Sequence, residues 1–97
     1  MVDRKSSTSR HSKPNAVFHA EFRDDLRYWI EQDRKVATRL LELVEAVIRE
    51  PFSGIGKPEP LKGPLAGCWS RRITREHRLV YVVDSSGVQF LQARYHY

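Results

Sequence analysis

The chain has 97 residues, of which 40% are hydrophobic and 30% are charged, a size and composition typical of one small soluble domain. No apolar run approaches the roughly 18 residues of a membrane span, and no apolar core follows the basic N-terminus as in a secretory signal. A single cysteine, Cys68, excludes an intramolecular disulfide and gives no metal-binding spacing, so we expect a cytoplasmic protein.

The net charge of +5 is unevenly distributed along the chain. Residues 1–19 carry a net charge of +3, residues 20–50 carry −2, and residues 51–97 carry +4. The acidic residues therefore belong to the middle of the chain, and the positive field belongs to its two ends. This division favours a polyanionic partner that meets the C-terminal half.

The N-terminal half predicts a tail, a strand and two helices. Residues 1–14 have too few apolar side chains to fold, so we expect a disordered basic tail and a folded domain over residues 15–97. Residues 16–18 suit a short strand. Apolar residues then recur at helical spacing, first at Phe22, Leu26, Trp29 and Ile30. A second helix is expected after the N-cap Asp33 and ends before Pro51, with an apolar stripe of Val36, Leu40, Leu41, Val44, Val47 and Ile48.

The glycines and prolines of residues 52–65 predict a loop. Within this loop Glu59 lies between Pro58 and Pro60, which restrict the backbone and hold the carboxylate in one direction. Lys57 and Lys62 flank it. An ordinary solvated loop glutamate is the alternative interpretation.

Residues 67–83 predict two strands joined by a tight connection at residues 74–76. Alternation places Leu79, Tyr81 and Val83 on one face and Arg78 with Val80 and Val82 on the other. By the same rule Ser70 and Arg72 lie opposite Trp69 and Ile73. Solvated arginines without a function are the alternative here.

After a turn at residues 84–87, residues 88–96 predict the last strand. Alternation groups Phe90, Gln92, Arg94 and His96 on one face, and Leu91, Ala93 and Tyr95 on the other. The second group is the more apolar, so we expect it to face the helices. Arg94 and His96 are then expected on the open face of the sheet.

Together these segments contain the groups that cleave RNA through its own 2′-hydroxyl: Glu59, Arg72, Arg78, His96 and Tyr97, with Lys57, Lys62 and Arg94 nearby. That reaction needs a base, cations for the phosphorane-like transition state and an acid for the leaving 5′-oxygen. Histidine suits the role of acid at neutral pH. The histidines show no metal-ligand spacing, and we expect neither a metal nor another cofactor. Ser70 and Cys68 are interpreted as packing residues.

Four motifs resemble the YoeB toxins of the RelE superfamily of bacterial toxin–antitoxin ribonucleases. They are Lys57-Pro-Glu-Pro-Leu-Lys62, Gly67-x-Trp-Ser-Arg-Arg-Ile-Thr74, Glu76-His-Arg-Leu-Val-Tyr81 and Arg94-Tyr-His-Tyr97. The resemblance runs from about residue 17 to the last residue. Cys68, where an aromatic residue is usual, and Arg75 depart from the family pattern.

The resemblance implies an α+β, microbial-ribonuclease-like fold of order β-α-α-β-β-β, with a twisted, mainly antiparallel sheet and two helices on one face. It also implies a ribosome-dependent endoribonuclease that cuts mRNA in the A site. In that family the residue matching Glu59 is the general base, that matching His96 the general acid, and that matching Arg78 stabilises the phosphate. Tyr97 would complete the site, and Arg72 and Lys62 would support RNA contacts. A YefM-type antitoxin and a homodimer are the expected partners, besides the ribosome and mRNA.

Two other functions stay open from the sequence. A ParE-like toxin would inhibit DNA gyrase and would lack the ribonuclease residues. A non-catalytic basic module that binds RNA or the ribosome would bind in a salt-sensitive way and would not depend on Glu59.

Overall fold

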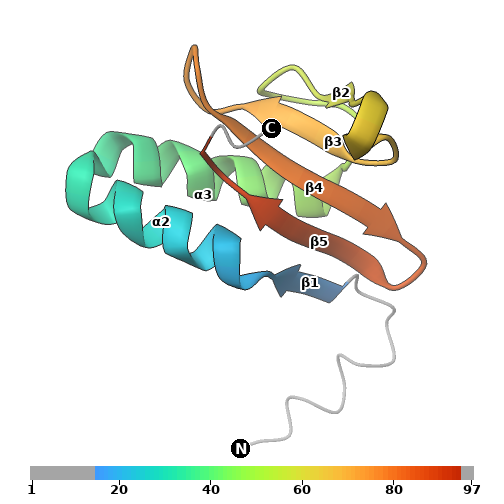
Figure 1. Cartoon of the computed structure of the whole chain (residues 1–97), viewed down its shortest axis with the longest axis horizontal. Helices are drawn as coiled ribbons and strands as arrows, with labels where there is room; N and C mark the ends of the chain where they lie inside the picture. Colours follow the sequence, from blue (N-terminus) through green and yellow to red (C-terminus); the bar gives the residue numbers. More distant parts are fainter. Residues whose placement is uncertain (1–14, 95–97) are drawn as a thin grey trace, which may run out of the picture.

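The computed structural model describes residues 15–94, so the expected tail (residues 1–14) and the expected site residues His96 and Tyr97 lie outside the described residues. Helices α2 (Ala20–Gln32) and α3 (Arg34–Arg49) cover one face of a five-stranded sheet (Figure 1). The elements of the sheet and its connection are β1 (Asn15–Phe18), β2 (Glu59–Pro60), the 3-10 turn η1 (Gly63–Leu65), β3 (Trp69–Arg72), β4 (Arg78–Asp84) and β5 (Gly87–Gln92).

The strands lie in the order β1-β5-β4-β3-β2. Only β1 pairs in parallel, with β5, and the other pairings are antiparallel. This arrangement confirms the expected α+β fold and adds the two-residue strand β2 inside the segment that the sequence predicts as a loop. Within residues 15–94 neither helix combines the length and the apolar character needed to cross a membrane.

The two helices begin and end close to the predicted positions. The Asp33 side chain accepts hydrogen bonds from the backbone N–H groups of Lys35 and Val36, as an N-cap does. The predicted stripe of α3 is wrong at one position. Leu41 is 46% exposed, whereas Leu43 is fully buried, because a period of 3.6 places residue 43 on the same side as residues 40 and 47.

The core lies between the helices and the covered face of the sheet, and its aromatic centre is formed by Phe22 of α2 and Phe90 of β5. Tyr81 is fully buried beside Phe90, and Leu79 is fully buried as well. Leu79 and Tyr81 belong to the core cluster that faces the helices, whereas Val80, although fully buried as well, does not, so the predicted alternation of β4 is confirmed. Arg78 and Val80 lie on the opposite face, which neither helix covers (Figure 1) and which we call the open face.

The predicted alternation of β5 is wrong at Phe90 and Leu91, because the strand contains an irregularity. Tyr81 pairs with Phe90 while its neighbour Val80 pairs with Gln92, so Leu91 is an extra residue in the ladder. Phe90 consequently faces the helices and is fully buried. Before the bulge the even-numbered residues Val88 and Phe90 face the helices, and beyond it the odd-numbered residues do. Ala93 therefore lies in the helix-facing core, as expected.

A buried arginine that the sequence analysis did not single out joins α3 to the sheet. Arg71 of β3 is fully buried, and it donates to the backbone oxygens of Glu50, Ser53 and Ile55. Its Nε donates to the hydroxyl of Tyr81, which in turn donates to the backbone oxygen of Pro51. Burial raises the pKa of the Tyr81 phenol, and the hydrogen bond from Arg71 partly offsets this rise. The guanidinium thus holds the whole turn that leaves α3.

We predict that Arg71→Met lowers the free energy of unfolding by about 3 kcal/mol or more, because several buried oxygens lose their donor together. The matched control is Arg27→Met, since the Arg27 side chain is 69% exposed and pairs with an exposed carboxylate, Asp24. We expect the control to change stability by less than about 0.5 kcal/mol. Urea unfolding of both variants checks this, and equal losses would contradict the assigned role of Arg71.

We also predict that adding a side chain at Gly87, the first residue of β5, destabilises the protein. A Cβ on Gly87 would lie 2.0 Å from the backbone oxygen of Asn15, and φ is +148°. Gly87→Ala should therefore cost about 2–4 kcal/mol and open the β1–β5 pairing. Gly63 also has a positive φ, +67°, but open space around it, so Gly63→Ala should cost only about 1 kcal/mol. Thermal midpoints that fall equally in the two variants would show that the close approach to β1 is unimportant.

Candidate functional site

The open face of the sheet brings together a glutamate, an arginine and a serine from three strands. Nη1 of Arg78 lies 3.2 Å from Oε1 of Glu59 and 3.1 Å from Oγ of Ser70. The Arg78 side chain is 23% exposed and that of Glu59 is 48% exposed, so the pair is open to a ligand. Two of the predicted site residues, Glu59 and Arg78, therefore lie in contact.

The pairing of β2 with β3 determines where Glu59 lies. Glu59 is opposite Ser70, which is opposite Val80 of β4, so these residues form a row across the sheet. The backbone N–H of Leu61 donates to the oxygen of Cys68 at 2.8 Å and closes this short ladder. Glu59 is therefore held by strand pairing as well as by its two prolines.

The turn before β2 packs closely against α3 and β3. A Cβ on Gly56 would lie 2.8 Å from Cδ2 of Leu43 and 3.1 Å from Cβ of Arg71. The Gly56 oxygen accepts a hydrogen bond from the backbone N–H of Arg72 at 2.6 Å. Lys57 follows with a left-handed φ of +53°. This segment, anchored by Arg71, leads directly to Glu59.

Arg72 adds a second cation to the row beside Glu59. It pairs in register with Arg78, and its buried Nε has no hydrogen-bond acceptor among the described residues. Two guanidinium groups therefore share this part of the open face with one carboxylate. The surplus positive charge suits an anionic ligand such as a phosphate.

Of the remaining predicted site residues, two lysines lie near Glu59 and Arg94 contacts helix α2. Lys57 and Lys62 are exposed on either side of Glu59, and neither forms an ion pair within residues 15–94. Arg94 is instead engaged with α2, since its guanidinium carbon lies 3.7 Å from the centroid of the Tyr28 ring. His96 and Tyr97 lie outside the described residues.

Ser70 was interpreted from the sequence as a packing residue, and this interpretation is incomplete. Its side chain is fully buried, but its hydroxyl accepts a hydrogen bond from Arg78. The signal that could have found it is its alternation with Arg72, which places it on the same face. Ser70 therefore helps to orient the arginine of the site.

The described part of the site can transfer a proton and hold an anion. The Glu59 carboxylate can accept a proton, and Nη2 and Nε of Arg78 make no hydrogen bond to a described residue, so they can donate to a phosphate. No group of three or more metal-ligating side chains occurs within residues 15–94.

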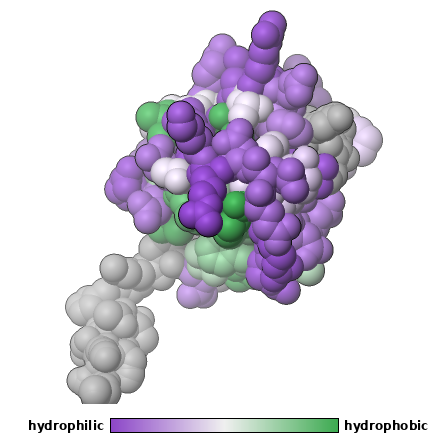
Figure 2. Space-filling model, turned by 90° about the vertical axis from the view of Figure 1, so that its left-hand side faces the viewer, coloured by the Kyte–Doolittle hydropathy of each residue, from purple (hydrophilic) through white to green (hydrophobic). Residues whose placement is uncertain are grey.

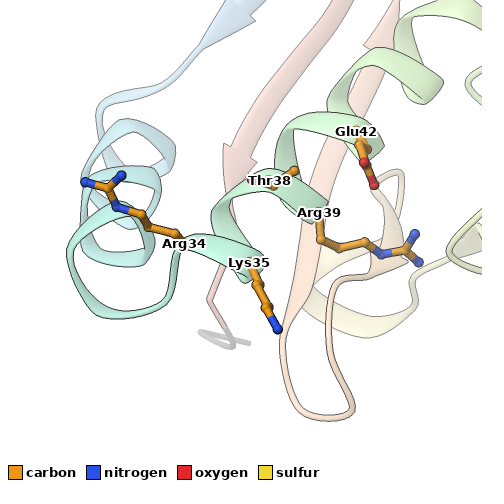
Figure 3. A pocket seen from close by; sticks show the side chains of 5 residues that line it. All are labelled: Arg34, Lys35, Thr38, Arg39 and Glu42. Carbon is orange, nitrogen blue, oxygen red and sulfur yellow. The ribbon is translucent and has the colours of Figure 1, made fainter.

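A second cationic surface lies on the first half of α3. Arg34, Lys35, Thr38, Arg39 and Glu42 line an open hollow of about 320 Å³ (Figure 3). Figure 2 shows that the end of the molecule where α2 meets α3 is mostly hydrophilic, with hydrophobic residues in small separate groups. The positive field is therefore not confined to the two ends of the chain, to which the charge count along the sequence assigned it. The fold gathers cations from a segment whose net charge is negative.

Comparison with known proteins identifies the family. The sequence profile of the YoeB-like toxins of bacterial type II toxin–antitoxin systems matches residues 18–97. The toxin RelK of Mycobacterium tuberculosis is 55% identical over 74 residues, which are 76% of this chain and 87% of that protein.

Solved structures of similar sequence share the fold. A YoeB/ParE toxin from Agrobacterium tumefaciens is 44% identical, with a TM-score of 0.80 over 86% of this chain and 99% of that chain. The YoeB dimer of Staphylococcus aureus is 40% identical, with a TM-score of 0.78 over 88% and 99% of the two chains. YoeB of that species also forms a heterotetrameric complex with YefM, in which its TM-score is 0.76 over 87% and 98%. The match over most of the domain shows that this chain belongs to the YoeB-like toxins of bacterial type II toxin–antitoxin systems.

Proposed function

We propose that this toxin is a ribosome-dependent, metal-independent endoribonuclease that cuts mRNA at the A site and thereby stops translation. The observation that carries the proposal is the Glu59–Arg78–Ser70 cluster on the open face, with Arg72 beside it. A carboxylate within reach of a guanidinium that still has free donors matches the needs of a reaction at a phosphodiester. The YoeB family membership supports the ribosomal substrate.

In the proposed reaction Glu59 takes the proton of the ribose 2′-hydroxyl. The 2′-oxygen then bonds to phosphorus, and the bond to the 5′-oxygen breaks. His96 donates the proton that the 5′-oxygen needs, and Tyr97 completes the site. The products are a 2′,3′-cyclic phosphate and a 5′-hydroxyl, so atoms and charges balance without an external reactant.

The cations of the open face have separate roles in this proposal. Glu59 and Ser70 occupy the two donor positions of Nη1 of Arg78, so Nη2 and Nε are left for the scissile phosphate. Arg72, which pairs in register with Arg78, would hold the same or the adjacent phosphate. Lys57, Lys62 and Arg94 would contact the RNA backbone.

We also propose that the toxin acts in the cytoplasm, forms a homodimer and is neutralised by a YefM-type antitoxin. The support is the S. aureus YoeB, which is 40% identical over nearly the whole domain and is found both as a dimer and in complex with YefM. Residues 1–14 would form a basic tail outside the toxin domain of residues 15–97.

The test uses ribosomes stalled on a defined mRNA. We expect the wild-type protein to cut at the A-site codon and to leave a 2′,3′-cyclic phosphate. Glu59→Gln removes the base but keeps an acceptor for Arg78, so the rate should fall by about 10²–10⁴-fold. His96→Ala should also lose cleavage. Glu45→Gln, on an exposed position of α3, is the matched control and should keep the wild-type rate.

A second mRNA tests whether the 2′-hydroxyl is the attacking group. An mRNA with a 2′-deoxy sugar at the cleavage position should be bound but left uncut, because it has no attacking oxygen. Cleavage of that mRNA, or full activity of Glu59→Gln, would exclude the proposed reaction. If the folded wild-type protein binds ribosomes in a salt-sensitive way without cutting, it is a binding module. If it inhibits gyrase instead, it acts as a ParE-like toxin.

A further inference from the structure

The connection between α3 and β2 is held from inside the protein by one buried arginine. In the described structure residues 50–58 form this connection without a helix or a strand. Nη1 of Arg71 donates to the backbone oxygen of Ile55 at 3.0 Å, and Nη2 donates to the oxygens of Glu50 and Ser53. An apolar side chain could fill the same space without burying a charge, whereas a guanidinium binds several oxygens in fixed directions.

A tyrosine from the neighbouring strand completes this attachment. The hydroxyl of Tyr81 on β4 accepts a hydrogen bond from Nε of Arg71 at 3.2 Å and donates one to the backbone oxygen of Pro51 at 2.7 Å. Both side chains are fully buried. We call them the Arg71–Tyr81 pair. The pair binds the connection at its start and in its middle, and each member fixes the direction of the other.

The attachment continues to Gly56, three residues before Glu59. Gly56 packs against Arg71, since a Cβ on this glycine would lie only 3.1 Å from Cβ of the arginine. Its oxygen accepts a hydrogen bond from the backbone N–H of Arg72 at 2.6 Å. Pro58, whose ring fixes its φ, then leads into β2. The position of Glu59 therefore depends on a segment that is attached to the strand carrying Arg71.

The Arg71–Tyr81 pair and Glu59 lie on opposite faces of the sheet. Arg71 pairs in register with Leu79, which belongs to the helix-facing core. The preceding residue, Ser70, points to the other face, where it lies opposite Glu59. Nη1 of Arg78 bonds both of these residues, at 3.1 and 3.2 Å. A small shift of the connection would therefore change the distance between the Glu59 carboxylate and Arg78.

We propose that Arg71 and Tyr81 are positioning residues for the reaction, because they hold the carboxylate of Glu59 beside Arg78 through the connection. The inference rests on the proposed function for the role of Glu59 as the base. A base must lie within hydrogen-bond reach of the proton that it takes, and a displacement of about 1 Å can lower the rate by about 10²-fold. The binding of RNA should change little, since neither member of the pair touches the substrate.

The test compares the kinetic constants of variants at equal folded fraction, on ribosomes stalled on a defined mRNA. Tyr81→Phe removes the hydroxyl but keeps the ring, and we expect kcat to fall by about 5–50-fold, with KM within about twofold of wild type. Arg71→Lys keeps the charge but loses the planar fork, so kcat should fall by at least as much. The control is Phe22→Leu, since Phe22 is a buried core residue of α2 and has no part in the connection. Its kcat should stay within about twofold of wild type.

A double-mutant cycle separates the positioning of Glu59 from a general loss of activity. In a Glu59→Gln background Tyr81→Phe should have less than about a twofold further effect, since the base that it positions is gone. An equal loss in both backgrounds would overturn the inference. Unchanged kcat in Tyr81→Phe would do the same, and this variant serves where Arg71→Lys does not fold.

A measurement without ribosomes keeps the inference separate from the proposed function. In NMR spectra of the full chain, Tyr81→Phe should shift the signals of Glu59. It should also speed amide exchange by about tenfold or more at Leu61, whose N–H bonds the oxygen of Cys68. Phe22→Leu should do neither at equal folded fraction. Failure of wild-type cleavage together with these changes would reject the ribonuclease and keep the role of the pair in placing Glu59. Signals of Glu59 and Leu61 that Tyr81→Phe leaves unchanged would reject that role.

Discussion

The structure depends on the buried guanidinium of Arg71. A cation that is fully removed from water must be compensated, and here backbone oxygens at the end of α3 and in the following turn provide the compensation. The C-terminal end of a helix carries partial negative charge, which favours a cation there. Because the same side chain belongs to β3, it joins the end of α3 to the sheet, in addition to the core between the two layers. The turn that leads to Glu59 starts from that point.

Much of the fold was predictable because it follows from local chemistry. Asp33 as an N-cap, the end of α3 before Pro51, and the alternation of β4 all depend on neighbouring residues in the sequence. The face of Phe90 was not predictable, because a bulge arises from the register between two strands. Arg71 was missed for a similar reason: its acceptors are backbone oxygens, which leave no mark in the side-chain pattern.

The same distinction applies to the candidate site. Glu59 and Arg78 could be singled out from the sequence, since both carry charge and the family motifs contain them, but their contact comes from the pairing of the strands. The role of Ser70 depends on where the Arg78 side chain lies, and the attachment of Arg94 depends on an aromatic ring contributed by α2. The roles of His96 and Tyr97 in the site stay predictions. The site is thus assembled from segments held by different means, the turn after α3 by Arg71 and the end of β5 by α2.

The parallel pairing of β1 with β5 affects how the protein is made. Asn15 pairs with Gly87, so the first strand of the domain finds its partner only in the last strand. During synthesis β1 must therefore wait until almost the whole chain has emerged, and contacts so distant in sequence form late. An incomplete nascent chain therefore has no finished sheet. A toxin that we propose to act on ribosomes would in this way be inactive while still attached to the ribosome that makes it.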